Sequence, residues 1–177
     1  MSAITDFYAG SGLDGSERTL REILAWPDRR LEEVHDYIQW LFPLPEPSGA
    51  NPSAPVLDAE TIAVFHTDDA VRGRLREALE RMLVFYGFAR HDGAIVAGEQ
   101  FEQHAREWLT PGNHNHLRLT RILRSLRVLG LEDEADRLWR GLEAIHAREI
   151  AAGRYSITER TFAYWRRAAT EPVGRWR

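Results

Sequence analysis

Apolar side chains recur every three or four residues along most of the chain, and this spacing constrains the fold more than any other feature. In residues 113–130, for example, Leu119, Ile122, Leu123, Leu126 and Leu129 fall on one face of a helix. The alternation of apolar and polar residues that is typical of strands extends over no useful length. The sequence therefore predicts an all-α protein.

Prolines, glycines and capping residues separate the predicted helices. Asp58 and either Asn113 or Asn115 are expected to cap two of them, and Ser156 with Glu159 predicts a capping box before the last. Residues 90–98 contain two glycines, which predicts a loop or a brief hairpin. We expect about seven helices. Their predicted ranges are 17–25, 28–41, 59–65, 69–85, 101 to just before Pro111, 113–130 and 132–151. A last helix is expected at the C-terminal end.

The length of 177 residues allows a folded chain to bury roughly 70% of the surface that it would expose when unfolded. One compact domain then needs no disulfide or metal to hold it together. We expect a single domain over residues 1–177, with a core at 17–169, an N-terminal segment at 1–16 and a tail at 170–177. No internal repeat of 20 to 50 residues indicates a solenoid.

Composition excludes several classes of protein. Hydrophobic residues at 44% and charged residues at 28% exclude a disordered chain. The lack of cysteine excludes disulfides, thiolate metal sites and cysteine nucleophiles. No apolar run approaches the roughly 18 residues of a membrane helix, and the first residues lack the pattern of a signal peptide. We therefore expect no transmembrane segment and a cytoplasmic location.

Residues 35–57 hold the most unusual stretch, in which a helix becomes apolar on all sides and runs into five prolines. Leu31, Ile38 and Leu41 share one helical face, while Trp40 points away from it. One interpretation is that the proline-rich loop covers Trp40 and Phe42. The other is an open aromatic groove for an extended peptide at Gln39 and Trp40.

No catalytic or metal-binding constellation emerges from the motifs. His104, His114 and His116 lack further ligands at the spacing that zinc requires. No hydrolase elbow, phosphate loop or dinucleotide fingerprint is present, so we expect no cofactor, no metal and no catalytic residues. His35 and His146 fall on or beside apolar stripes, which predicts hydrogen-bonded core histidines. An uncharacterised enzyme stays an alternative.

The start of the helix at 113–130 is a candidate anion site. No acidic residue lies between Glu107 and Glu132, while four arginines recur at every third position, namely Arg118, Arg121, Arg124 and Arg127. Free backbone N–H groups at a helix start, two histidines and Arg118 with Arg121 could hold a phosphate, a carboxylate or a peptide C-terminus. Steps of three residues spread the arginines over an arc, so structural pairing with the acids at 132–136 is the other interpretation. A third is nucleic-acid binding by the arginine arc at 118–127, although the net charge of -4 does not favour it.

Two blocks resemble the opioid growth factor receptor conserved domain family. Residues 35–44, with Glu46-Pro47, Asn51-Pro52, Pro55 and Leu57, resemble one family signature, and residues 114–123 with 129–131 are similar to the other. The pairs Phe7-Tyr8, Met82-Leu83 and Phe85-Tyr86 also match. The resemblance implies an all-helical domain, and in animals the family is associated with binding an enkephalin-type opioid peptide. All 23 basic residues are arginine, which together with the length predicts a short microbial member.

We therefore expect a helical binding module rather than an enzyme, with an unidentified small anion or peptide as its ligand. The ligand is expected where the proline-rich loop approaches the start of the helix at 113–130. No feature predicts the oligomeric state. The residues expected to bind the ligand are Gln39, Trp40, Asn51, His114, His116, Arg118 and Arg121.

Overall fold

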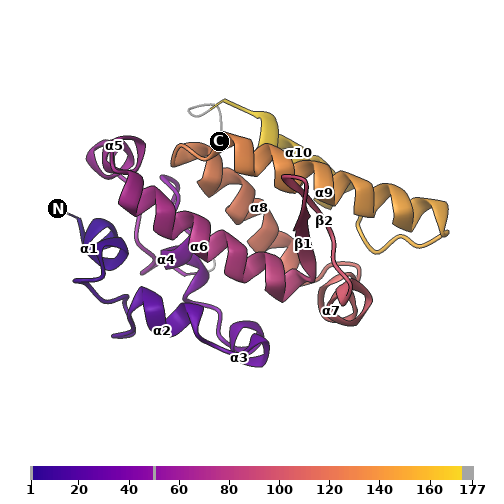
Figure 1. Cartoon of the computed structure of the whole chain (residues 1–177), viewed down its shortest axis with the longest axis horizontal. Helices are drawn as coiled ribbons and strands as arrows, with labels where there is room; N and C mark the ends of the chain where they lie inside the picture. Colours follow the sequence, from indigo (N-terminus) through magenta and orange to yellow (C-terminus); the bar gives the residue numbers. More distant parts are fainter. Residues whose placement is uncertain (1, 50, 173–177) are drawn as a thin grey trace. The chain divides into compact units, whose positions relative to one another are not determined.

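The computed structural model describes residues 2–49 and 51–172. Helices make up 61% of the described residues, which form ten helices and one pair of strands (Figure 1). The prediction of a mainly helical protein is confirmed, but the prediction of a strictly all-α protein with about seven helices is wrong. Helices and strands of only four to seven residues are too short for periodicity to reveal.

The described residues fall into two compact units. The first unit contains those of residues 1–81 together with 128–130, and the second contains those of residues 82–127 and 131–172. The single domain over residues 1–177 stays a prediction.

The first unit is built mainly from short helices. They are α1 (Ala3–Ala9), α2 (Leu20–Leu24), α3 (Asp28–Glu33), α4 (Ile38–Leu41) and α5 (Ala59–Thr67), with most of α6 (Asp69–Tyr86). Side-chain caps define several starts: Ser2 accepts from the backbone of Thr5 in α1, and Asp58 caps α5 as predicted. The sequence pattern did not reveal α1, and the helix predicted at 17–25 is shorter than expected.

Aromatic rings fill the core of the first unit. Phe7, Tyr8, Phe42 and Phe65 are all fully buried. The rings of Tyr8 and Phe65 lie 4.9 Å apart in an edge-to-face arrangement, and the Tyr8 hydroxyl donates to the backbone oxygen of Leu41. This packing joins α1, α4 and α5 around one cluster.

The second unit contains a β-hairpin, which follows the last residues of α6. Strand β1 (Phe88–His91) pairs antiparallel with β2 (Ala94–Ala97), and Arg90 lies opposite Ile95. The turn residues Asp92 and Gly93 have positive φ angles of 48° and 79°, as the primed turns of two-residue hairpins require. Phe88 and Ile95 are buried, so one face of the hairpin packs inward. Of the two alternatives for residues 90–98, the hairpin is correct.

The remaining helices of the second unit are α7 (Phe101–Trp108), most of α8 (His114–Val128), α9 (Glu132–Ala151) and α10 (Glu159–Thr170). Helices α9 and α10 lie side by side (Figure 1), and the rings of Trp139 and Phe162 are 5.1 Å apart between them. The predicted capping box at Ser156 is wrong. Thr158 caps α10 by accepting from the backbone of Thr161, while the Ser156 hydroxyl donates to Glu149.

The two histidines predicted to lie in the core do not have that role. His35 is exposed. His146 is half-buried and stacks on Phe162 with ring centroids 3.9 Å apart, and its buried Nε2 has no hydrogen-bond partner among the described residues. The prediction made from the apolar stripes therefore overestimated the burial of both side chains.

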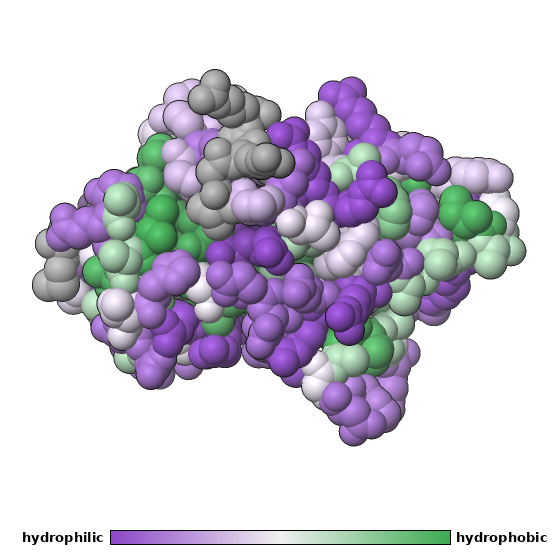
Figure 2. Space-filling view, turned by 90° about the horizontal axis from the view of Figure 1, so that it is seen from above, coloured by the Kyte–Doolittle hydropathy of each residue, from purple (hydrophilic) through white to green (hydrophobic). Residues whose placement is uncertain are grey.

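Hydrophilic residues cover most of the face shown in Figure 2, and hydrophobic residues gather there in separate areas. Within residues 2–49 and 51–172, no helix is both long enough and apolar enough to cross a membrane.

Candidate functional site

A pocket in the first unit brings together three of the seven residues predicted to bind a ligand. Gln39, Trp40 and Asn51 line this pocket, which has a volume of about 300 Å³. Its remaining lining residues are Gly15, Ser16, His35, Asp36 and Ser53. Their segments are the loop before α2, the connection between α3 and α4, α4 itself, and the proline-rich segment at 43–57. We call this site the Trp40 pocket.

A break between two helices creates one wall of the Trp40 pocket. The single helix predicted over 28–41 is wrong, because Val34 adopts an extended conformation at the end of α3. With its side-chain amide turned to the orientation that satisfies both of its ends, the buried Gln39 donates to the carbonyl oxygens of Asp36 at 3.0 Å and His35 at 3.2 Å. In a continuous helix these two carbonyl oxygens would accept hydrogen bonds from backbone N–H groups. At the break they accept from a side chain instead. Gln39 holds the wall in place and lines the pocket as well.

Ion pairs and hydrogen bonds fix the opposite wall. Asp36 accepts from the Ser16 hydroxyl at 2.7 Å and from Arg18 Nη2 at 2.9 Å. The buried Asp14 accepts from Arg18 Nε at 2.7 Å and from the backbone of Ser16 at 2.9 Å. These bonds attach the loop before α2 to the connection between α3 and α4.

The carboxylate of Asp36 supplies the negative charge of the pocket. Burial raises its pKa, but hydrogen bonds from Ser16 and Arg18 and the positive charge of Arg18 outweigh burial. The pKa of Asp36 therefore lies below its ordinary value, and the group is ionised at neutral pH.

Trp40 and Asn51 each carry a hydrogen-bond donor that no other described residue accepts. The Trp40 ring is half-buried and lies 5.5 Å from the Phe7 ring, and its N–H has no hydrogen-bond partner in the part of the chain that the structure describes. The side-chain oxygen of Asn51 accepts from the backbone and hydroxyl of Ser53, at 3.2 and 2.8 Å. Its amide nitrogen has no partner within the described residues. The pocket thus combines an aromatic ring, a carboxylate and two donors that have no partner among residues 2–49 and 51–172.

The other four predicted residues belong to the start of α8 in the second unit. His114 is exposed and Arg121 is half-buried, whereas His116 and Arg118 are buried, at 3% and 5% exposure. Arg118 Nη1 donates to the side-chain oxygen of Asn115 at 3.2 Å. The anion site at this helix start stays a prediction.

His116 lies between two tryptophans. Its ring centroid is 6.3 Å from that of Trp108 and 5.3 Å from that of Trp165, and neither ring nitrogen has a well-aligned hydrogen-bond partner within the described residues. Burial lowers the pKa of His116, the nearby backbone of Trp108 raises it in part, and the charge of His114 lowers it further. The resulting pKa is below the ordinary value, so the ring is neutral at neutral pH.

The arginine arc at 118–127 is not an exposed basic face. Arg124 is 1% exposed and Arg118 is 5% exposed. Arg127 Nη1 lies 3.1 Å from a carboxylate oxygen of Asp136, as the structural-pairing interpretation expects. Contacts to nucleic-acid phosphates need accessible guanidinium groups. The arc therefore offers fewer such groups than its sequence suggests.

Sequence reasoning missed Ser16, Asp36 and Ser53 as lining residues. Asp14, Ser16 and Arg18 alternate in a glycine-containing stretch, which is typical of a side-chain-stabilised turn. That signal predicts a turn, but it does not reveal that the turn meets Asp36.

A comparison with known protein families matches residues 19–168 to the opioid growth factor receptor (OGFr) conserved region. The chain belongs to this family. The resemblance noted in the two signature blocks is thereby confirmed.

Curated relatives support the same assignment. Opioid growth factor receptor from Rattus norvegicus is 46% identical over 112 residues, which are 60% of this chain and 19% of that protein. The protein of the same name from Homo sapiens is 42% identical over 112 residues, 60% of this chain and 16% of the relative. Opioid growth factor receptor-like protein 1 from Mus musculus is 41% identical over 106 residues, 58% of this chain and 22% of the relative. The chain thus spans about a fifth of the length of these proteins. No solved structure matches it.

Proposed function

We propose that this protein is a peptide-binding module and that the Trp40 pocket receives the N-terminal residue of the peptide. The observation that carries the proposal is the placement of the Trp40 ring, the ionised Asp36 and the free amide of Asn51 around one pocket. Three residues singled out from the sequence for ligand binding contribute to it.

The charge in the pocket favours a cationic group over an anion. Asp36 is the acidic lining residue, and Arg18, which pairs with it, also pairs with Asp14. An ammonium group can approach the remaining side of the Asp36 carboxylate and the electron-rich face of Trp40. The α-amino group of a peptide supplies such a charge, whereas a phosphate would be repelled.

The neutral groups suit a peptide backbone. The indole N–H of Trp40 and the amide of Asn51 can donate to peptide carbonyls, and the hydroxyl of Ser53 lies beside them. A volume of about 300 Å³ is at the small end of ligand pockets, so it suits one residue rather than a whole peptide. Some relatives are named receptors for opioid growth factor. For this chain we propose only a short peptide with a free N-terminus.

Nuclear magnetic resonance of the tryptophan indole N–H groups tests the proposal. The signal of Trp40 can be assigned with Trp40→Phe, and the protein is then titrated with pentapeptides that begin with Tyr, Phe, Leu, Arg or Ser. Each peptide is used with a free α-amino group and with an acetylated one. We expect at least one free peptide to shift the Trp40 signal, its acetylated form to have little effect, and the buried Trp165 signal to stay in place.

Asp36→Asn separates the charge from the shape of the pocket. This variant keeps the size of the side chain, so we expect it to weaken binding of the free peptide about tenfold or more. If no peptide of the set moves the Trp40 signal, the proposed pocket is wrong. If free and acetylated peptides bind equally, the role of Asp36 is wrong.

A further inference from the structure

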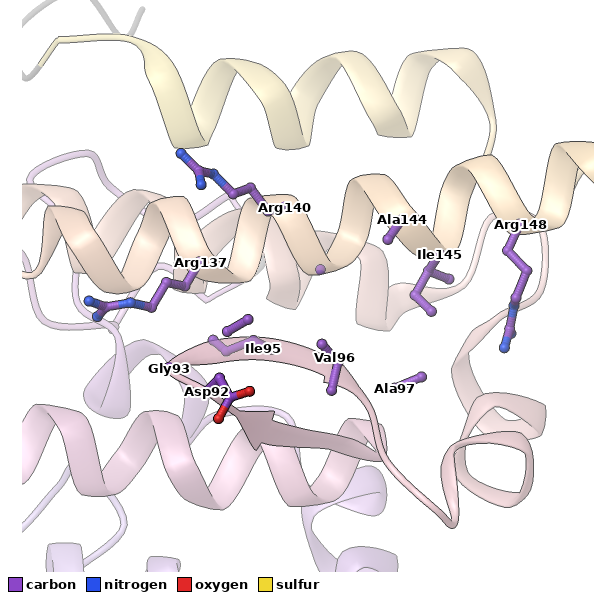
Figure 3. Close-up of a pocket in the computed structure, with 12 residues that line it drawn as sticks. Asp92, Gly93, Ile95, Val96, Ala97, Arg137, Arg140, Ala144, Ile145 and Arg148 are labelled. Atoms are coloured by element: carbon purple, nitrogen blue, oxygen red, sulfur yellow. The ribbon is translucent and has the colours of Figure 1, made fainter.

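A second hollow lies in the second unit, between the hairpin and α9 (Figure 3). Its volume is about 580 Å³, nearly twice that of the Trp40 pocket. Strand β2 lines one side, and the other side is formed by residues 137–148 of α9. We call it the β2–α9 groove.

Small residues keep the groove open. Gly141 lies so close to β2 that an added Cβ would be 2.8 Å from the carbonyl oxygen of Ile95. Ala97 and Ala144 line the groove without long side chains, and Ile145 adds apolar surface. The helix and strand therefore approach each other at Gly141, while an apolar channel remains beside this contact.

Guanidinium groups mark the two ends of the groove. Arg137 and Arg148 extend from α9 toward the side of the hairpin (Figure 3). Arg148 comes eleven positions after Arg137, which corresponds to about 16 Å along the helix axis. Arg140 also lines the groove, and Asp92 is the acidic residue of the lining. The charges of the lining are therefore mainly positive.

Both arginines have carboxylate partners within the protein, but each remains accessible to a carboxylate of a partner. Arg137 binds Glu134 at 3.0 Å, and the Arg137 side chain is 41% exposed, so its guanidinium group is accessible to a second carboxylate. Arg148 Nη1 binds the 74% exposed side chain of Glu102 at 2.7 Å, while Arg148 Nη2 lies 3.6 Å from the buried Glu149. The Arg148–Glu102 pair is exposed, and exposed ion pairs contribute little to stability, so an incoming carboxylate can take the place of Glu102.

From this geometry we propose that the β2–α9 groove binds an extended acidic segment of a partner protein. An extended chain advances about 3.3 Å per residue, so about five residues cover the distance between Arg137 and Arg148. The segment carries acidic residues four to five positions apart, with small apolar residues between them against Ile95, Ala144 and Ile145. This site is separate from the Trp40 pocket and does not depend on the function proposed for it.

Fluorescence anisotropy with labelled peptides tests the inference. The probe peptide has two glutamates separated by a spacer of four residues, which are three alanines and one valine. A series of such probes varies the length of the spacer from one to six residues. We expect the tightest binding at spacers of three or four residues, and a loss of at least tenfold when both glutamates become glutamines. Affinity should also fall as salt rises, since the contacts are between charged groups.

Protein variants locate the site. Arg137→Gln and Arg148→Gln should each weaken the probe at least tenfold, and Ala144→Trp should do so without a change in charge by filling the groove. Arg76→Gln, an exposed arginine of α6 in the first unit, is the matched charge control and should stay within twofold of the parent protein. Trp40→Phe should also leave this affinity unchanged.

Three results would overturn the inference. They are the absence of binding at about 50 mM salt, equal binding of the glutamate and glutamine probes, and full affinity in a folded Ala144→Trp variant. Circular dichroism and thermal unfolding of each variant establish that it is folded. If Ala144→Trp does not fold, the affinities of the two arginine variants and of the glutamine probe still decide.

Discussion

Gly73 and Gly141 both lie inside helices, yet the structure predicts opposite effects when each is replaced by alanine. Gly73 is in α6, and an added Cβ would meet no atom within 4 Å. Gly141 is in α9, where the same atom would lie 2.8 Å from the Ile95 carbonyl oxygen. The pair therefore separates the intrinsic preference of a helix for alanine from the packing of α9 against β2.

The expected magnitudes follow from two opposing effects. Alanine in a helix interior is more favourable than glycine by roughly 0.5–1 kcal/mol, so Gly73→Ala should raise the free energy of unfolding by about that amount. At Gly141 the same gain opposes a contact about 0.6 Å shorter than the ordinary limit of 3.4 Å. The clashing atom belongs to the backbone, so the strand must move, and overpacking of this kind costs about 1–3 kcal/mol. Gly141→Ala should therefore lower the free energy of unfolding by about 1 kcal/mol.

Urea unfolding followed by far-ultraviolet circular dichroism measures both variants against the parent. A change of 1 kcal/mol corresponds to roughly 2–4 °C in Tm for a chain of this size, so the two variants should differ by several degrees in a thermal scan. If Gly141→Ala is as stable as the parent or more stable, the inference that α9 and β2 are in close contact at Gly141 is wrong. If Gly73→Ala destabilises the protein, the inference that there is space for a methyl group at Gly73 is wrong.

Three further predictions concern the histidine between the tryptophans, the cap of α10 and the carboxylate of the Trp40 pocket. Because burial lowers the pKa of His116 from 6.5, the unfolded chain binds this proton more readily below about pH 6.5. The free energy of unfolding should fall as the pH drops through that range, and His116→Leu should reduce the slope in urea titrations from pH 7.5 to 5. Thr158→Ala should lower the free energy of unfolding by about 1 kcal/mol through loss of the helix cap, and Ser156→Ala, which leaves that cap intact, is the comparison. Because the pKa of Asp36 is lowered in the folded protein, its ion pair stabilises above about pH 4 and is lost as the pH falls through the folded pKa. Asp36→Asn should therefore cost less than about 1 kcal/mol at pH 7, because the side chain is 44% exposed, and the difference should shrink below pH 4.

Local patterns in the sequence were sufficient for the long helices. Helix α9 has the predicted bounds, and α6 ends one residue beyond the prediction, because apolar periodicity over many residues and a terminal glycine are unambiguous. The hairpin was foreseen only as an alternative to a loop, since strands of four residues barely show alternation. The family was evident from two blocks of specific residues, which the match over residues 19–168 confirms.

The candidate site shows where sequence reasoning stops. Gln39, Trp40 and Asn51 were singled out because they are polar or aromatic groups beyond what an apolar stripe requires. The break between α3 and α4 was missed, and the contacts made there are distant in the chain: Asp36 accepts hydrogen bonds from Ser16 and Arg18. Helical periodicity describes only one element at a time, so it could not reveal this contact.

The sequence by itself determined that the protein is mainly helical, that it belongs to the opioid growth factor receptor family, and which residues deserved attention as ligand contacts. Tertiary structure decided which of those residues remain accessible. Trp40 is half-buried beside a pocket, whereas His116 is closed between two tryptophans and Arg118 is almost fully buried. The physical reason is that helical preference and capping depend on near neighbours in the chain. Burial and charge pairing depend on residues tens of positions away, which only the folded chain brings together.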